Sequence, residues 1–111
     1  MTIKISELAL SKKAKDIKIL DLRNLSDVAD YFVVCSGDVS QQVKAIIDAI
    51  EEGLLKNGIK PWHIEGYSHA NWVILDYVDV VVHVFNQEIR QFYDLEGLWG
   101  DAPCLEIKDS S

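Results

Sequence analysis

The sequence contains few of the residues that build disulfide-rich, membrane-spanning or loop-rich proteins. Among 111 residues there are two cysteines, two prolines and six glycines. Cys35 lies inside an apolar stretch and Cys104 lies near the end of the chain, which favours two free thiols over a bridge. No apolar run approaches the ~18 residues of a membrane span, and no apolar leader segment opens the chain. We therefore expect a cytoplasmic protein that has no membrane partner.

Positive charge is also scarce. Eleven lysines and arginines stand against eighteen aspartates and glutamates, which gives a formal charge of −7. Such a chain is repelled by free nucleic acid and is suited to a basic protein partner. Lysines do gather near the N-terminus, at Lys12, Lys13, Lys15 and Lys18. We interpret this cluster as a solvated helix face, with a minor contact to RNA as the alternative.

The sequence lacks the residue patterns of the common catalytic sites. Nucleotidyl transfer needs two carboxylates on one strand face, but Asp76 and Asp79 are three residues apart and would flank a turn. His63 and Glu65 share a strand face, yet a zinc site built on them would lack its second cysteine. Cys35 follows two valines, as a buried inert thiol does. We therefore expect no catalytic residue, no metal ligand and no cofactor.

Hydrophobic periodicity predicts a single α/β domain. Apolar residues recur every three or four positions in the clearest helix, and β-branched runs mark the strands. The predicted helices are 6–15, the segment that carries Val43, Ile46, Ile47, Ile50 and Leu54, and about 88–98. The predicted strands are 18–23, 31–35, 61–66, 71–77 and 80–85. The order αββαβββα indicates a mixed β-sheet with flanking helices.

Local patterns predict the ends of the helices. Ser6 is the expected N-cap of the first helix, and Asp38 or Ser40 is the expected cap of the second. The pair Asn57-Gly58 should close the second helix in a left-handed conformation.

The ends of the domain also follow from composition. The segment after Cys104 is polar and has no apolar period. We assign 1–104 to the domain and 105–111 to a short, loose C-terminal tail.

The aromatic residues are the best candidates for a binding surface. Along NWVILDY the side chains alternate between two mostly apolar faces. One face carries Trp72, Ile74 and Asp76, and the other carries Val73, Leu75 and Tyr77. Tryptophan and tyrosine often dominate protein interfaces, but the sequence equally allows Trp72 and Tyr77 to be core residues. Trp62 and Trp99 are interpreted as packing residues.

Histidine leaves two interpretations open. His83 would approach His63 if their strands pair, as in a metal site. A hydrogen-bonded core or edge histidine is the preferred interpretation.

Several long motifs resemble one known family. They are DYFVVCSG, a following helix with QVKAI, GIKPWHIEG, and WVILDYVDVVVHVF followed by R-x-F-Y-D-L-E-x-L-W-G-D-A-P. Together they cover roughly residues 5 to 103 and are similar to the ribosomal silencing factors, the Iojap/RsfS family. Two positions depart from the family pattern: Val78 stands where glycine is common, and Gly97 replaces a polar residue. Val78 should be strained if its turn requires a positive φ.

The resemblance implies a nucleotidyltransferase-like topology without catalytic carboxylates. It implies a non-enzymatic factor that binds the large ribosomal subunit through its protein numbered fourteen, blocks joining with the small subunit and so represses translation. It also implies a homodimer. The partner-binding residues it suggests are Trp72, Leu75, Asp76, Tyr77 and His83. The alternatives are a nucleotidyltransferase-like enzyme that acts on a nucleotide, and a small scaffold protein unrelated to ribosomes.

Overall fold

Two almost wholly apolar strands form the centre of the sheet. The computed structural model describes residues 1–107 except the side chains of 91–93 and 96. In it, β2 (Tyr31–Gly37) pairs in parallel with β5 (Val80–Asn86). All but one residue of each strand is buried, as expected where helices cover both faces of a sheet. The prediction of a central strand at 31–35 is confirmed.

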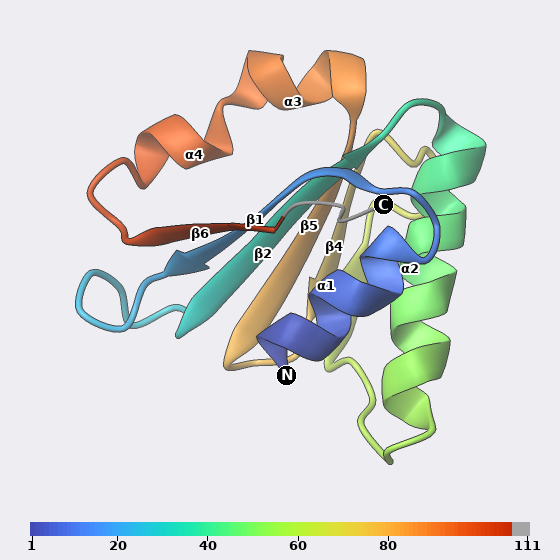
Figure 1. The fold of residues 1–111 in the computed structure, drawn as a ribbon, viewed down its shortest axis with the longest axis horizontal. Coiled ribbons are helices and arrows are strands. Elements are labelled where there is room, and N and C mark those ends of the chain that lie inside the picture. The colour runs from blue at the N-terminus through green and yellow to red at the C-terminus, as the bar shows by residue number, and fades with distance from the viewer. Residues whose placement is uncertain (108–111) are drawn as a thin grey trace.

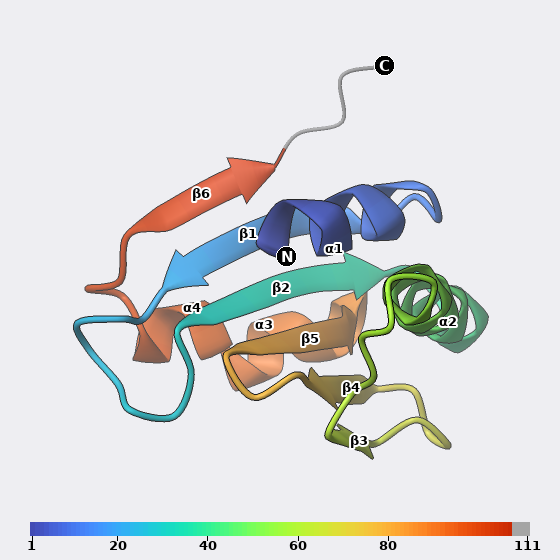
Figure 2. The ribbon, with the colours of Figure 1, turned by 90° about the horizontal axis from the view of Figure 1, so that it is seen from below.

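Antiparallel strands extend this pair on both sides (Figure 2). β1 (Lys15–Asp21) joins β2, and β4 (Trp72–Asp76) joins β5. The two edge strands are β3 (His63–Glu65) beside β4 and β6 (Cys104–Ile107) beside β1. The six-stranded sheet has the order β3-β4-β5-β2-β1-β6. The predicted fold class, a mixed sheet with flanking helices, is confirmed.

Helices cover the two faces of the sheet unequally (Figure 1). α1 (Thr2–Leu10) and the long α2 (Ser40–Leu55) pack on one face and enclose the larger apolar core. The short α3 (Gln87–Tyr93) and α4 (Leu95–Leu98) cross the other face over a smaller core.

α2 follows its predicted pattern except at its start. The five predicted apolar positions, 43, 46, 47, 50 and 54, are all buried. Neither Asp38 nor Ser40 caps the helix; Val39 occupies the N-cap position, and the Asp38 carboxylate forms an ion pair with Lys15 instead (2.9 Å). At the other end Gly58 adopts a φ of 76°, and the Ile59 N–H donates to the carbonyl oxygen of Leu54 (3.0 Å), which is the left-handed closure expected of glycine.

α1 begins before its predicted start. Ser6 lies inside the helix, buried, and donates its hydroxyl to the Thr2 carbonyl (2.9 Å), so the prediction of Ser6 as an N-cap is wrong. The helix packs closely on α2, because a Cβ on Gly53 would lie 2.5 Å from the Leu8 side chain. Gly53 therefore allows the two helices to approach despite its low helix propensity.

The predicted helix at 88–98 is two helices. Asp94 adopts a left-handed conformation with a φ of 45°, which ends α3, and its carboxylate then caps α4 through the Gly97 N–H (3.2 Å). Aspartate is one of the few residues that tolerate this conformation, and apolar periodicity does not detect such a turn. A Cβ at position 97 would collide with the Asp94 carboxylate, so Gly97 leaves room for the cap.

The predicted loose tail is also wrong over its first part. Residues 104–107 form β6 and pair with β1, with Leu105 opposite Ile19 and Ile107 opposite Ile17. The predicted boundary between residues 104 and 105 therefore falls inside a strand. Residues 108–111 lie outside the described part of the chain.

We predict that deleting residues 104–111 lowers the free energy of unfolding by about 2 kcal/mol. The deletion removes the β6 hydrogen bonds and exposes the edge of β1, where Ile17 and Ile19 are buried. Urea unfolding measures the loss, with a deletion of 108–111 alone as the control. Equal stability of the two truncated proteins would show that β6 contributes nothing.

We predict that Val78→Gly stabilises the protein by ~1 kcal/mol. Val78 has a φ of 72° in a tight turn in which the Asp79 N–H donates to the Tyr77 carbonyl (2.9 Å). Its side chain is exposed, so little packing is lost, and glycine adopts this φ without strain. Thermal unfolding should show a higher Tm for Val78→Gly than for Val78→Ala, which keeps a Cβ. A lower Tm for Val78→Gly than for the wild-type protein would show that Val78 is not strained in this turn.

Candidate functional site

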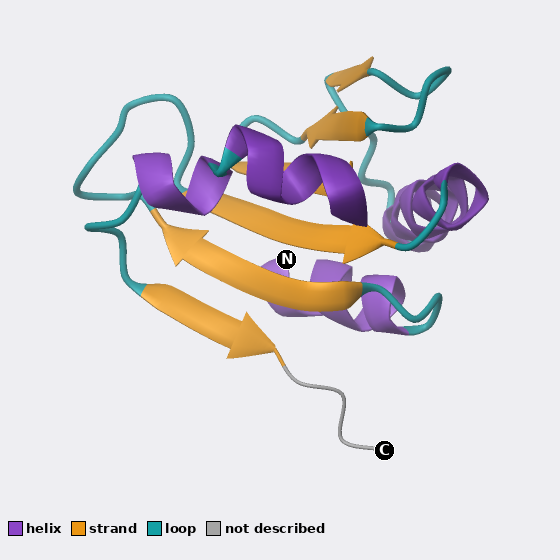
Figure 3. Ribbon diagram, turned by 90° about the horizontal axis from the view of Figure 1, so that it is seen from above, coloured by secondary structure: helices purple, strands orange, loops and turns teal. Residues whose placement is uncertain are grey.

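The sheet face opposite α1 and α2 is incompletely covered at its β3–β4 end. α3 contacts β5 and β2 in the middle of the sheet, and Figure 3 shows the short strands β3 and β4 beyond the helices on this side. Directly paired residues project from the same face of a sheet. The register pairs His63 with Asp76 and Glu65 with Ile74. We call the resulting surface the open face; it consists of His63, Glu65, Trp72, Ile74 and Asp76.

Exposure increases across the open face from β5 outward. On β5, which pairs with β4, His83 and Phe85 are buried. The open-face residues of β4 are half-buried, and those of β3 are exposed. The surface is therefore an aromatic and aliphatic strip with carboxylates along its outer side.

Trp72 is fixed in place by its contacts with β5. Its indole Nε1 donates to Nδ1 of His83 (3.1 Å), and its ring stacks on Phe85 with centroids 5.0 Å apart. His83 in turn contacts the ring of Phe32 (4.5 Å between centroids). A rigid, half-exposed aromatic ring of this kind loses little entropy when a partner covers it.

His83 is a neutral core histidine. Its side chain is 5% exposed, and burial lowers its pKa from 6.5 to about 4, because the charged ring loses hydration. The bond from Trp72 requires a lone pair on Nδ1, which places the proton on Nε2. The interpretation of His83 as a hydrogen-bonded core residue is confirmed. It does not approach His63, because β4 lies between their strands.

The five sequence-predicted site residues divide between the two faces. Trp72, Asp76 and His83 belong to the side of the open face, and Asp76 accepts a hydrogen bond from the Val78 N–H at the turn (2.7 Å). Leu75 and Tyr77 point the other way, into the core beneath the helices, and are 0% and 7% exposed. Their burial removes them from the candidate surface.

Ile74 and two residues of β3 belong to the open face but were not among the predicted partner-binding residues. His63 and Glu65 lie together on the open face, with His63 Nε2 2.8 Å from Glu65 Oε1. Their alternation along H-I-E had indicated a shared face. Only the strand pairing shows that this face continues that of Trp72 and Ile74.

The other two tryptophans, Trp99 and Trp62, differ in how much of the side chain is exposed. Trp99 is half-buried and meets the ring of Phe32 edge-on (5.9 Å), so its predicted packing role is confirmed. Trp62 is 76% exposed, and its predicted packing role is wrong. Its sequence position, beside Pro61 and before β3, gave no measure of how much of the ring a neighbour would cover.

The buried cysteine of β2 is not an activated nucleophile. Both cysteines are free, and burial raises the pKa of the Cys35 thiol to about 12, so Cys35 is protonated and unreactive at neutral pH. Among the side chains that the structure describes, there is no group of three His, Cys, Asp or Glu residues that could hold a metal ion. No helix in the described part of the chain is long and apolar enough to cross a membrane.

The family model and the relatives found by sequence comparison all indicate the same family. Residues 1–111 match the family model described as "Ribosomal silencing factor during starvation". A ribosomal silencing factor RsfS of Bacillus subtilis is 47% identical over 96 residues, which cover 86% of this chain and 81% of that protein. The chloroplastic protein Iojap of Zea mays is 32% identical over 95% of this chain and 46% of its own length.

Comparison with solved structures agrees with the sequence matches. A crystal structure of a protein from Bacillus halodurans superposes with a TM-score of 0.83 at 35% identity and covers 95% of each chain. A protein from Chromobacterium violaceum superposes with a TM-score of 0.81 at 36% identity, over 90% of this chain and 87% of that one.

We predict that His83 makes folding sensitive to mild acid. Its pKa is about 4 when folded and 6.5 as a model value. Between these values the unfolded chain takes up a proton that the folded chain does not. The free energy of unfolding is therefore complete above pH 6.5 and decreases by up to ~3 kcal/mol as the pH falls to about 4.

Two variants isolate this contribution from the titration of carboxylates. His83→Gln keeps an acceptor for Trp72 but does not titrate, so its unfolding free energy should fall less steeply over this range. His69→Gln, at an exposed position, should keep the wild-type slope. Chemical unfolding at a series of pH values measures all three proteins. An unchanged slope in His83→Gln would show that other groups control the acid response.

Proposed function

Because this chain belongs to the ribosomal silencing factor family, we propose that it binds the large ribosomal subunit through the subunit's protein numbered fourteen and prevents the small subunit from joining. Family membership over the whole chain supports the proposal. A further relative supports the choice of subunit: a Mus musculus protein named for mitochondrial assembly of the ribosomal large subunit is 30% identical over 91 residues.

The mechanism we propose is steric and cytoplasmic, without catalysis. The domain measures 33 × 33 × 31 Å. A rigid body of this size, held at the surface where two subunits meet, occupies space that the small subunit needs. Translation would then stop for lack of joined ribosomes, with no reaction required.

The observation that carries the proposal is the composition of the open face. Trp72 and Ile74 give it a half-exposed apolar centre, and the Asp76 and Glu65 carboxylates lie beside that centre. A buried aromatic anchor with a polar rim is the usual arrangement of a protein interface. The net charge of −7 favours a basic ribosomal protein over bare RNA and would speed association with it.

A homodimer is the second part of the proposal. The open face is apolar enough to pair with a second copy of itself, and a twofold contact would use the same residues on both chains. Dimer and ribosome contacts would then compete. Dimer dissociation should accompany binding to the ribosomal protein in a sedimentation experiment at matched concentrations.

Subunit joining tests the proposed function directly. Purified protein added to separated subunits should co-sediment with large subunits and reduce the fraction of joined ribosomes in a sucrose gradient. Normal joining in the presence of saturating protein would refute the proposal.

We predict that Trp72→Ala weakens binding to the isolated ribosomal protein about thirtyfold, or ~2 kcal/mol. The variant also loses the bond to His83, so a moderate fall in Tm is expected alongside. Asp76→Asn keeps the oxygen that accepts from Val78 and removes only the charge, so it should weaken binding without lowering Tm.

Val28→Ala provides the control, because it removes a highly exposed apolar side chain in the loop between β1 and β2, outside the open face. It should bind the ribosomal protein as tightly as wild type. Wild-type affinity in both Trp72→Ala and Asp76→Asn would show that the partner binds elsewhere.

A further inference from the structure

The indole of Trp72 turns its polar edge towards the core. Its Nε1–H donates to Nδ1 of His83 (3.1 Å), and His83 lies on β5 with a side chain that is 5% exposed. The ring of Trp72 also stacks on Phe85, with the two ring planes inclined by 24°. The edge of the indole that faces away from the core therefore consists of carbon atoms.

Stacking alone does not decide which edge of the indole faces the core. The attraction between two stacked rings depends on their separation and offset, and it changes little when one ring turns over. A hydrogen bond depends steeply on direction. The acceptor at position 83 therefore selects one orientation of Trp72 from those that stacking on Phe85 allows.

His83 is held so that one ring nitrogen serves Trp72. Its ring centroid lies 4.5 Å from that of Phe32 and 6.4 Å from that of Phe85. Burial keeps the ring neutral at pH 7, because its pKa falls to about 4. A neutral ring whose Nδ1 accepts a hydrogen bond carries its proton on Nε2.

This arrangement leaves a buried donor without a partner. Nε2 of His83 is buried and has no hydrogen-bond partner among the residues that the structure describes. A buried donor of this kind costs free energy, and an apolar ring at position 83 would avoid that cost. Packing therefore does not explain the histidine, whereas an acceptor directed at Trp72 does.

Direct contact with a partner does not explain His83 either. Its strand neighbour on the same face is Ile74, and both Ile74 and Trp72 are more exposed than His83. A protein laid on the open face would meet these two residues first. His83 can act on such a partner only through Trp72.

We propose that His83 is a positioning residue, which holds Trp72 in the one orientation that the partner protein recognises and does not touch the partner itself. The inference deepens the proposed function and rests on it, because it concerns the same open face. It adds that the partner meets the carbon edge of Trp72 and receives no hydrogen bond from the indole N–H. Without the acceptor, the indole would have to be ordered again on binding, which weakens affinity about fivefold.

Hydrogen exchange of the indole N–H, followed by NMR, tests the geometry without a partner. In the wild-type protein the Trp72 N–H should exchange far more slowly than that of Trp62, which is 76% exposed. His83→Phe keeps a ring beside Phe32 but removes the acceptor, so exchange at Trp72 should become about tenfold faster. His83→Asn places an amide oxygen near the position of Nδ1 and should keep exchange slow. Equal exchange in the wild type and His83→Phe would overturn the proposal.

Affinity for the isolated ribosomal protein tests the role in binding. His83→Phe should bind about fivefold more weakly than wild type, and His83→Asn within about twofold of it. Trp72→Phe removes the donor and leaves His83 unchanged. In the Trp72→Phe background, His83→Phe should cause no further loss, because both changes remove the same bond. Additive losses would show that His83 acts through packing and would refute the positioning role.

The order of the Tm values separates positioning from folding. His83→Asn leaves a smaller side chain in the core and should have the lower Tm, whereas His83→Phe fills the site and should melt close to wild type. Affinity should follow the opposite order. Affinity that follows Tm would contradict the proposal. His69→Asn, at an exposed position outside the open face, is the control and should change neither affinity nor exchange at Trp72.

The two measurements also separate this inference from the proposed function. Failure of the wild-type protein to bind the ribosomal protein would refute the proposed function, and the inference with it. Fast exchange of the Trp72 N–H in a wild-type protein that does bind would refute the positioning role alone.

Discussion

The parallel pairing of β2 with β5 is the constraint on which the rest of the structure depends. Both strands are apolar on both faces, so both faces of the sheet need a cover. The connection between them holds α2 and the β3–β4 hairpin, and α1 joins α2 on the same side. The other face must therefore be covered by the residues that follow β5, which are the short helices α3 and α4.

The position of α3 decides which part of the second face stays open. Asn86 caps the helix at the end of β5, and Arg90 donates to the Ser36 hydroxyl (2.8 Å) and to the Lys15 carbonyl (3.5 Å). These bonds tie α3 towards β2 and β1. The turn at Asp94 then leads the chain to β6 at the far edge. The β4 side receives little cover, and Trp72 remains half-exposed there.

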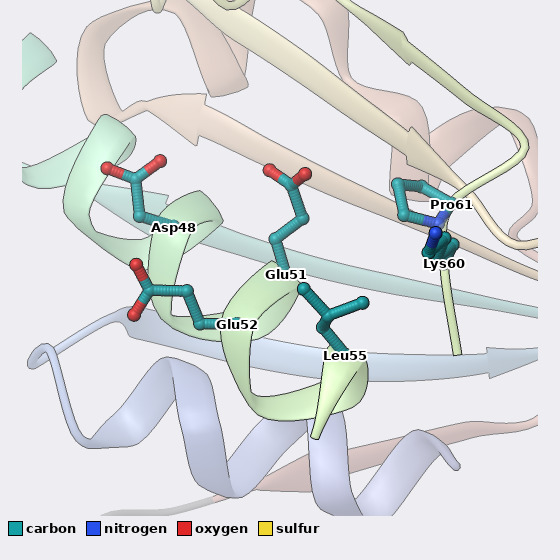
Figure 4. A pocket seen from close by; sticks show the side chains of 6 residues that line it. All are labelled: Asp48, Glu51, Glu52, Leu55, Lys60 and Pro61. Carbon is teal, nitrogen blue, oxygen red and sulfur yellow. The ribbon is translucent and has the colours of Figure 1, made fainter. Parts of the chain in front are cut away.

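The same architecture gives the molecule two chemically different surfaces. The open face has an apolar and aromatic centre held rigid by contacts with β5, as an anchor for a protein partner requires. The outer surface of α2 is polar instead, and carries the carboxylates of Asp48, Glu51 and Glu52 beside Lys60 (Figure 4).

The sequence by itself determined the elements whose information is local. The stripe from Val43 to Leu54 and the apolar run of β2 specify a buried helix and a central strand, because their periodicity records which side chains face the core. Alternation along β4 also showed that Trp72 and Tyr77 lie on opposite faces. Only the tertiary structure decided which of the two is exposed, because α2 covers Tyr77 and the short α3 leaves Trp72 partly uncovered. The break at Asp94 depends on one backbone angle, and β6 depends on pairing with a strand far away in sequence. Neither leaves a periodic pattern, and for that physical reason neither could be predicted from the sequence.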